Sequence, residues 1–214
     1  MHQIDFFLDF VSPYAYLAFE QLPQALSGHS YQVRYRPVLF AGLLKYHRQR
    51  GPAEIGPKRD WTYRQVLWLA RSLEISMQLP KTHPFNPLAL LRLAVACGDD
   101  DGLPNRYVTE AIFHHVWQGG DDATDPPRLQ YLTQQLAPRR DPNGDEVKSR
   151  LHAMTDDALD CGIFGVPSMR ADGKLFWGLD ALPMLRDYLD GDAVLSGADW
   201  DAVAGVVVGV RRDP

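Results

Sequence analysis

Residues 4–19 read Ile-Asp-Phe-Phe-Leu-Asp-Phe-Val-Ser-Pro-Tyr-Ala-Tyr-Leu-Ala-Phe, and this stretch decides the fold. The apolar, β-favouring run over 3–10 predicts a buried strand that ends in a turn. Ser12 then stands at a helix N-cap with Pro13 at the first helical position, so we expect a helix to about residue 24 or 26. A second strand is predicted over 31–39, and the strand–helix–strand order indicates a right-handed βαβ unit.

The character of the sequence changes between residues 42 and 161, where apolar residues recur at helical spacing. Proline-rich connections separate the helical segments, as in the stretch 79–87. We therefore expect this block to be entirely helical. The predicted helices are 58–73, 87–96, 104–117, 126–136 and 145–161.

Strand-type patterns return after the helical block. Two short apolar runs, 165–170 and 175–178, flank the dipeptide Asp172-Gly173, which is a strong hairpin signal. A last helix is predicted from near Asp180 to about residue 189. Strands thus stand at both ends of the chain, with helices between them.

This order of elements predicts an α/β fold: a thioredoxin-like domain interrupted by an all-helical insertion. The split domain would comprise residues 1–41 and 162–214, and the insertion residues 42–161. A chain of 214 residues is long enough to bury a sizeable core in this arrangement.

Composition excludes several classes of partner. The formal net charge is −5, which gives no electrostatic basis for binding nucleic acid or an anionic membrane. No stretch approaches the roughly 20 apolar residues of a membrane-spanning helix, and the N-terminus does not read as a secretion signal. The two cysteines, Cys97 and Cys161, fit no redox or metal-binding spacing. We expect a reduced, cytoplasmic protein.

Ser12 occupies the corner where a disulfide oxidoreductase of this fold would carry Cys-x-x-Cys. The four positions here are Ser12, Pro13, Tyr14 and Ala15, so no disulfide can form. Ser12 is readily explained as a plain helix cap. Its hydroxyl also lies at the positive end of a helix dipole, a place that favours an anion such as a thiolate.

Two later residues have both a structural and a functional interpretation. Pro167 is compatible with a simple strand start, but in thioredoxin-like folds this place holds a cis-proline that faces the active-site helix. The residue before it, Val166, would then present free backbone groups to a peptide-like ligand. Asp180 is compatible with a helix cap, or with pairing to the ammonium group of a ligand.

Four motifs in order carry a family resemblance over roughly residues 3–190. The chain resembles the 2-hydroxychromene-2-carboxylate isomerases and their relatives, the kappa-class glutathione transferases, which share a DsbA-like thioredoxin fold. The motifs are Asp-Phe-Val-Ser-Pro-Tyr-Ala-Tyr-Leu-Ala (9–18), Gly-Pro-Ala-Glu-Ile-Gly-Pro-Lys (51–58), Phe-Gly-Val-Pro (164–167) and Trp-Gly-Leu-Asp (177–180).

The resemblance implies glutathione as the cofactor, with Ser12 hydrogen-bonding its sulfur as the catalytic residue. It also implies that Val166 and Pro167 hold the cysteinyl unit, that Asp180 binds the γ-glutamyl ammonium and that Lys58 contacts the glycine end. Two cofactor positions depart from the family pattern. Gln49 and Leu179 stand where relatives carry Asn, and Asn or Ser, respectively.

The implied reaction is a cis-trans isomerisation of a conjugated aromatic oxo-acid by thiolate addition, bond rotation and elimination. The alternative is a kappa-like transferase that releases the conjugate of an electrophile, and a distant alternative is a non-catalytic module that binds peptides beside Pro167. The resemblance also implies a homodimer.

The loop that contains His83, Phe85 and Asn86 is the candidate lining of the substrate pocket, together with Tyr14. An ordinary helix entry with Asn86 as the cap explains the same residues. His114 and His115 do not read as a metal pair, because neighbouring residues on a helix face different directions. No metal is predicted.

Overall fold

The central sheet of the computed structural model has the strand order β2-β1-β3-β4. β1 (His2–Leu8) pairs in parallel with β2 (Tyr31–Pro37) and antiparallel with β3 (Ser168–Ala171), and β4 (Lys174–Trp177) closes the hairpin with β3. The structure describes residues 1–197, 200, 202–207 and 209–210. The predicted domain segment 162–214 therefore ends outside the described residues.

The side chains of β1 point alternately to the two faces of the sheet, and both faces are covered. Ile4, Phe6 and Leu8 point into the larger hydrophobic cluster, whereas Phe7 belongs to a second cluster on the other face. Successive side chains of a strand point to opposite faces, and a strand with apolar residues on both faces lies in the middle of a layered fold. This is the position that β1 occupies.

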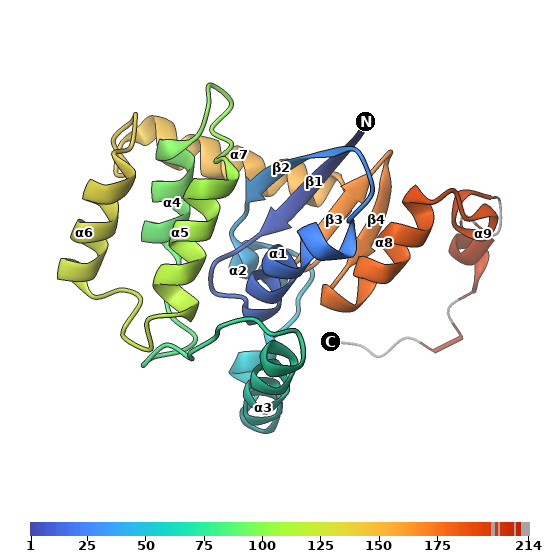
Figure 1. Ribbon diagram of the computed structural model, residues 1–214, viewed down its shortest axis with the longest axis horizontal. Helices are drawn as coiled ribbons and strands as arrows, with labels where there is room; N and C mark the ends of the chain where they lie inside the picture. Colours follow the sequence, from blue (N-terminus) through green and yellow to red (C-terminus); the bar gives the residue numbers. More distant parts are fainter. Residues whose placement is uncertain (198–199, 201, 208, 211–214) are drawn as a thin grey trace.

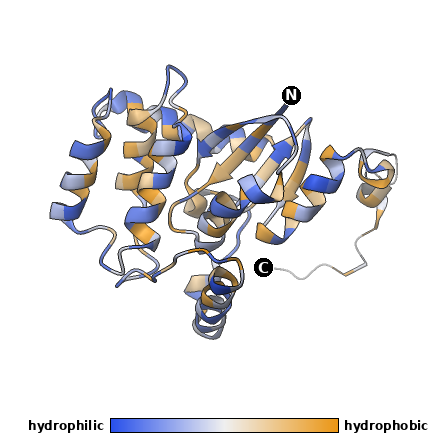
Figure 2. Ribbon diagram, in the orientation of Figure 1, coloured by the Kyte–Doolittle hydropathy of each residue, from blue (hydrophilic) through white to orange (hydrophobic). Residues whose placement is uncertain are grey.

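Helices cover the two faces of the sheet. In Figure 1, α1 (Pro13–Ala25) and α8 (Leu182–Leu189) lie in front of the strands, and α7 (Asp145–Asp160) runs behind them. Figure 2 shows hydrophobic residues concentrated on the strands and on the helix sides that meet them. The layers therefore form an α/β fold, as the sequence predicts.

The segment between β2 and β3 is helical in the structure, in agreement with the prediction. One further helix, α2 (Phe40–Tyr46), has no counterpart in the prediction, since it is only seven residues long and has no side-chain N-cap. The other elements are η1 (Pro52–Glu54), α3 (Gly56–Ser72), α4 (Leu88–Cys97), α5 (Arg106–Trp117) and α6 (Pro126–Leu136). None of the described helices combines the length and apolarity that a bilayer span requires.

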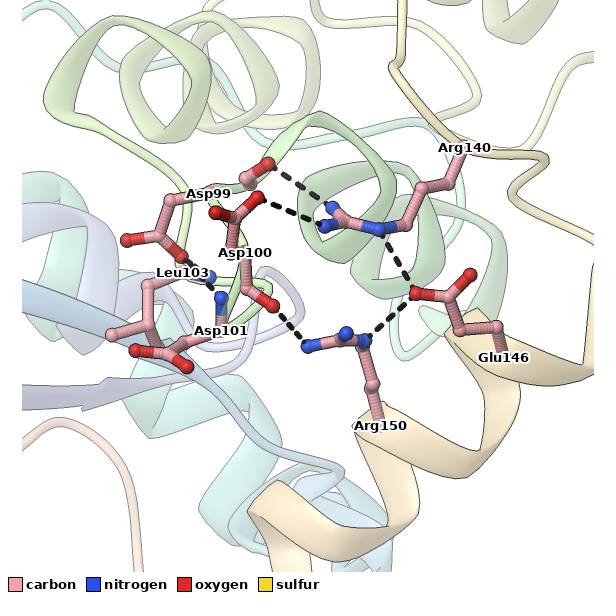
Figure 3. A network of polar contacts seen from close by, with 8 residues as sticks. Asp99, Asp100, Asp101, Leu103, Arg140, Glu146 and Arg150 are labelled. Carbon is pink, nitrogen blue, oxygen red and sulfur yellow. Dashed lines mark hydrogen bonds and ion pairs between the residues drawn. The ribbon is translucent and has the colours of Figure 1, made fainter.

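A polar network joins the loop after α4 to the beginning of α7 (Figure 3). Arg140 donates to Glu146 at 3.1 Å and to the Gly98 carbonyl at 3.2 Å, and Arg150 donates to the same carboxylate at 3.1 Å. Charged networks of this kind are worth more than isolated surface pairs. The network fixes the outer end of the helical segment, while one continuous hydrophobic cluster joins its inner side to the sheet. The division at residues 42 and 161 stays a prediction.

The hairpin forms where the Asp-Gly signal predicts it. Asp172 and Gly173 both have positive φ, 49° and 85°, as a two-residue turn of the primed type requires. The last helix begins later than predicted. Leu179–Ala181 form a 3-10 turn, η2, and α8 starts at Leu182. Asp180 therefore does not cap α8, whose N-cap is Ala181. Beyond it lie α9 (Ala193–Ser196) and η3 (Val203–Gly205).

Candidate active site

Ser12 lies at the junction of β1, α1 and the loop before β3. Its Oγ accepts a hydrogen bond from Ala15 N at 3.2 Å, which is the predicted N-cap contact, and donates a long one to the Val166 carbonyl at 3.4 Å. The Val166–Pro167 peptide bond is cis. Ser12 is 8 % exposed, so its hydroxyl is largely shielded from bulk water. The N-terminus of α1 and the cis-proline loop thus meet at one hydroxyl group.

A cavity of about 710 Å³ opens beside this junction. It brings together residues that are more than 100 positions apart in the sequence. All six residues predicted to bind a cofactor line it: Gln49, Lys58, Val166, Pro167, Leu179 and Asp180. Arg50, Gln65 and Trp177 line it as well and were not predicted. We refer to it as the polar cavity.

Opposite charges flank the polar cavity. Lys58 and Arg50 supply positive charge and Asp180 supplies negative charge, and all three are exposed. Within the described part of the chain, none of these groups forms an ion pair, and the Val166 N–H has no hydrogen-bond acceptor. A zwitterionic ligand with a peptide-like backbone matches this set of groups.

A smaller cavity of about 240 Å³ adjoins the polar cavity. The two share a wall, and Ser12 lines the smaller one. The residues of the shared wall are Tyr14, Phe40, Leu44, Pro52 and Val166. Most of its remaining lining is aliphatic or aromatic, and no lysine or arginine among the described residues reaches it. We refer to it as the apolar cavity.

His83 and Phe85 line the apolar cavity, as predicted. Both ring nitrogens of His83 are engaged: Nε2 lies 2.7 Å from the Val11 carbonyl and Nδ1 lies 2.8 Å from the Tyr63 hydroxyl. Because only a protonated nitrogen can donate to a carbonyl, the ring carries its proton on Nε2. Burial lowers the pKa of His83, which favours this neutral form. His83 therefore anchors its loop to the Ser12 turn and has no free nitrogen for proton transfer.

The other two predicted pocket residues differ in their placement. The Tyr14 hydroxyl donates to Gln65 Oε1 at 2.7 Å, and Tyr14 lines both cavities. Burial raises the pKa of Tyr14, so it stays a neutral donor. Asn86 is exposed and lines neither cavity. Its Oδ1 accepts from Leu88 N at 3.1 Å at the entry to α4, but the N-cap of this helix is Pro87 and not Asn86.

Asp9 is a functional candidate that the sequence did not reveal. It lines the apolar cavity, yet the residue is 0 % exposed. One carboxylate oxygen accepts from Val11 N at 3.1 Å and the other from Phe40 N at 2.9 Å. Burial raises the pKa of Asp9 to about 7, against the lowering effect of these two bonds. Asp9 thus holds the Ser12 turn against the start of α2.

Residues 3–190 match the family model of the DSBA-like thioredoxin domain. The chain belongs to this family. It is 28 % identical to 2-hydroxychromene-2-carboxylate isomerase of Sphingobium xenophagum, with 87 % of this chain and 97 % of that protein covered. It is 26 % identical to glutathione S-transferase kappa 2 of Caenorhabditis elegans, with 87 % and 91 % covered.

A solved structure of 2-hydroxychromene-2-carboxylate isomerase has the same fold. It superposes with a TM-score of 0.75 at 22 % identity, over 92 % of this chain and 98 % of that one. The predicted DsbA-like thioredoxin fold is therefore confirmed. The relationship to isomerases and glutathione transferases supports an enzyme.

This DsbA-like chain has no disulfide at the usual corner. Cys97 and Cys161 are both free thiols elsewhere in the fold. Burial raises the pKa of Cys97 to about 11, so this thiol stays protonated at neutral pH. Neither cysteine lines the two cavities.

His114 has partners that are not apparent in the sequence. Glu20 on α1 and Glu110 on α5 lie near it, and one ligand atom from each of the three residues falls within 4.8 Å of the others. His114 Nε2 lies 2.8 Å from Glu20, and Glu110 faces Arg106 at 3.6 Å. The absence of a metal therefore stays a prediction. The ion pairs, however, already account for this cluster.

Gly165 controls the position of Trp177 in the polar cavity. A Cβ at Gly165 would lie 2.7 Å from Trp177 Nε1, and the indole packs edge-on against Phe164 at 5.0 Å. We expect Gly165→Ala to displace this half-exposed indole and to weaken ligand binding in the polar cavity about threefold to tenfold, with little loss of stability. Gly56→Ala is the matched control, because its Cβ would meet nothing within 4 Å. Equal affinity of both variants for a ligand of the polar cavity would contradict this prediction.

Proposed function

We propose that this protein is a glutathione-dependent cis-trans isomerase of the 2-hydroxychromene-2-carboxylate type, acting on a small conjugated aromatic oxo-acid. One observation carries the proposal: a polar cavity with the charges of a zwitterion shares a wall with an apolar cavity that Ser12 lines, and Ser12 bonds to Val166 of that wall. A cofactor and a substrate can therefore occupy neighbouring spaces, with Ser12 in the lining of the apolar one.

The residues of the polar cavity fit glutathione. Asp180 would pair with the γ-glutamyl ammonium, and Lys58 would pair with the carboxylate at the glycine end. The Val166 N–H and carbonyl would bond to the cysteinyl unit as a short strand pair. Leu179 supplies no polar contact, whereas Gln49 supplies an amide. Arg50 adds a second cation on the side of Lys58.

Glutathione supplies a thiol whose ionised form adds reversibly to a conjugated double bond. A free thiol has a pKa near 8.5, so only a few per cent is ionised at pH 7. Ser12 offers a hydroxyl donor at the N-terminus of α1, and both features stabilise a nearby anion. Ser12 is not an activated nucleophile, because the His83 nitrogens and the Asp9 oxygens are already engaged.

One observation favours the kappa-type transferase as a second candidate. An aromatic oxo-acid carries a carboxylate, but no lysine or arginine of the described chain lines the apolar cavity. Its acidic neighbours, Asp9 and Glu54, disfavour an anion further when they are ionised. An uncharged electrophile would meet no such penalty.

The decisive experiment begins with a glutathione titration followed by thermal shift. Binding at millimolar glutathione supports both enzyme proposals, whereas its absence would favour a non-catalytic binding module. Turnover of 2-hydroxychromene-2-carboxylate is then compared with conjugation of an aryl halide. Isomerisation without loss of glutathione supports the proposed isomerase, and conjugation alone supports the transferase. The homodimer stays a prediction that sedimentation can test.

Asp180 provides a sharp test of the cofactor site. We expect Asp180→Asn to weaken glutathione binding about fivefold, the size of one partly exposed ion pair. Asp187→Asn is the matched control, since Asp187 is an exposed carboxylate on α8 outside both cavities. Calorimetry measures both affinities. The loss should also diminish at high salt, because salt screens exposed charges. If Asp187→Asn lost as much glutathione affinity as Asp180→Asn, Asp180 would have no specific role in binding the cofactor.

A further inference from the structure

A third hollow lies on the opposite side of α2 from the apolar cavity. Phe40 and Leu44 of α2 face the apolar cavity, while Gly42 and Lys45 line a groove of about 570 Å³. The other walls of this groove come from α4 and from one face of α7. We call it the α2–α4–α7 groove. Neither the predicted cofactor residues nor the predicted substrate residues contribute to it.

The charges that line the groove are predominantly positive. Lys45, Arg92 and Lys148 come from the three different helices, and Lys148 is paired with Asp145 at 3.1 Å. The acidic residue of the lining, Asp156, lies 2.8 Å from His152 on the same helix. The whole chain carries a formal net charge of −5, so this concentration of cations does not follow from its composition. The groove is electropositive on an otherwise acidic protein.

Arg92 is the most informative of these cations. It is partly buried on α4, and its Nε is covered from solvent without a hydrogen-bond acceptor among the described residues. It also forms no ion pair with any described carboxylate. Buried donors in native proteins are almost always satisfied, and each exception calls for an explanation such as a bound ion. A guanidinium group presents a fork of donors that matches a carboxylate in a bidentate manner.

The floor of the groove is apolar. Leu151 is 4 % exposed, and Leu39, Leu88 and Leu159 are partly buried beside it. The Thr155 hydroxyl is already used, since it donates to Leu151 O at 2.9 Å and accepts from Leu39 N at 3.1 Å. The groove therefore offers cations for one end of a ligand and hydrocarbon for the remainder.

We propose that the α2–α4–α7 groove binds an amphiphilic monocarboxylate, a small organic acid with an aromatic or aliphatic body. The carboxylate would accept from the Arg92 guanidinium, with Lys45 adding positive charge at the rim. The apolar body would lie on the leucine floor. This inference is independent of the proposed function, because it involves none of the residues assigned to glutathione or its substrate.

The first test compares two probes that differ only in charge. Naphthalene-2-carboxylate and naphthalene-2-carboxamide are titrated by calorimetry in the absence of glutathione, so that failure of the proposed function does not affect the result. We expect the carboxylate to bind at least about tenfold more tightly than the amide, as a charge-assisted pair requires. Equal affinities, or no binding of the carboxylate at millimolar concentration, would overturn the proposal.

The second test locates the site. Arg92→Met keeps the apolar stem and removes the guanidinium, and it should weaken carboxylate binding about tenfold without lowering the thermal midpoint of the free protein. Arg71→Met is the matched control, because Arg71 is exposed on α3 away from the groove. Lys45→Gln, at an exposed position, should weaken binding severalfold and is available if Arg92→Met does not fold. Unchanged affinity in the folded groove variants would refute the assignment.

Discussion

Ser12→Ala is expected to lower turnover at pH 7 about 10- to 100-fold while glutathione affinity changes little. The hydroxyl would contact the thiolate and not the peptide part of the cofactor, so its removal acts on ionisation more than on binding. Lowering a thiol pKa by about two units requires about 2.7 kcal/mol. A hydroxyl donor and a helix N-terminus each contribute about 0.5–2 kcal/mol, so loss of the hydroxyl removes a large share.

The measurement is the ultraviolet absorbance of the bound thiolate as a function of pH. The midpoint of this pH titration should lie below the ordinary thiol pKa in the wild type. In Ser12→Ala it should lie about one pH unit above the wild-type midpoint. Loss of the N-cap will also cost about 1 kcal/mol of stability, so Ser12→Thr, which keeps a hydroxyl cap, serves as the rescue variant. Ser72→Ala removes an exposed hydroxyl on α3 and controls for general effects. An unchanged thiolate midpoint in Ser12→Ala would exclude the proposed role.

The Ser12 corner was predictable because its signals are local. An apolar run, a serine cap and a proline at the first helical position are adjacent in sequence, and each favours the observed strand, turn and helix. The residues of the polar cavity could not be grouped from local signals alone. Lys58, Val166 and Asp180 lie in three separate segments, and only the ordered family motifs indicated that they belong together.

The features that escaped prediction depend on contacts between distant segments. In the sequence, Asp9 looks like a polar interruption of an apolar run. Its carboxylate can be buried only because Phe40, which is distant in the sequence, donates its backbone N–H to it. The same holds for α2 itself, whose seven residues carry no side-chain cap. The isolated guanidinium of Arg92 likewise becomes visible only when α2, α4 and α7 enclose it.

Asp9→Asn is expected to change how the stability of the protein depends on pH. The pKa of Asp9 is raised in the folded state from its ordinary value of 3.8 to about 7. The folded protein therefore binds this proton more tightly than the unfolded chain does. The contribution of Asp9 is fully present below about pH 4 and is lost as the pH rises to about 7. A pKa change of this size corresponds to about 4 kcal/mol.

The asparagine variant has no group that titrates at this position. Its amide oxygen can accept from Val11 N or Phe40 N but not from both, so the variant should be less stable than the wild type at pH 5 by about 1–3 kcal/mol. Only the wild type loses stability through Asp9 between pH 5 and pH 8. The difference in the free energy of unfolding between the two proteins should therefore close or reverse over this pH range. Burial lowers the pKa of His83, which makes stability rise with pH. This contribution is the same in both proteins and cancels in the difference between them.

Urea unfolding of both proteins at several pH values between 4.5 and 8 measures this difference directly. The expected result is a difference in the free energy of unfolding that falls steadily towards pH 7 and then levels off. A difference that stays constant with pH would mean that Asp9 is ionised throughout this range in the folded protein. The cavity beside Ser12 would then hold a permanent negative charge, which disfavours a neighbouring thiolate. The pH dependence of Asp9 therefore also tests whether this corner is electrostatically suited to an anion.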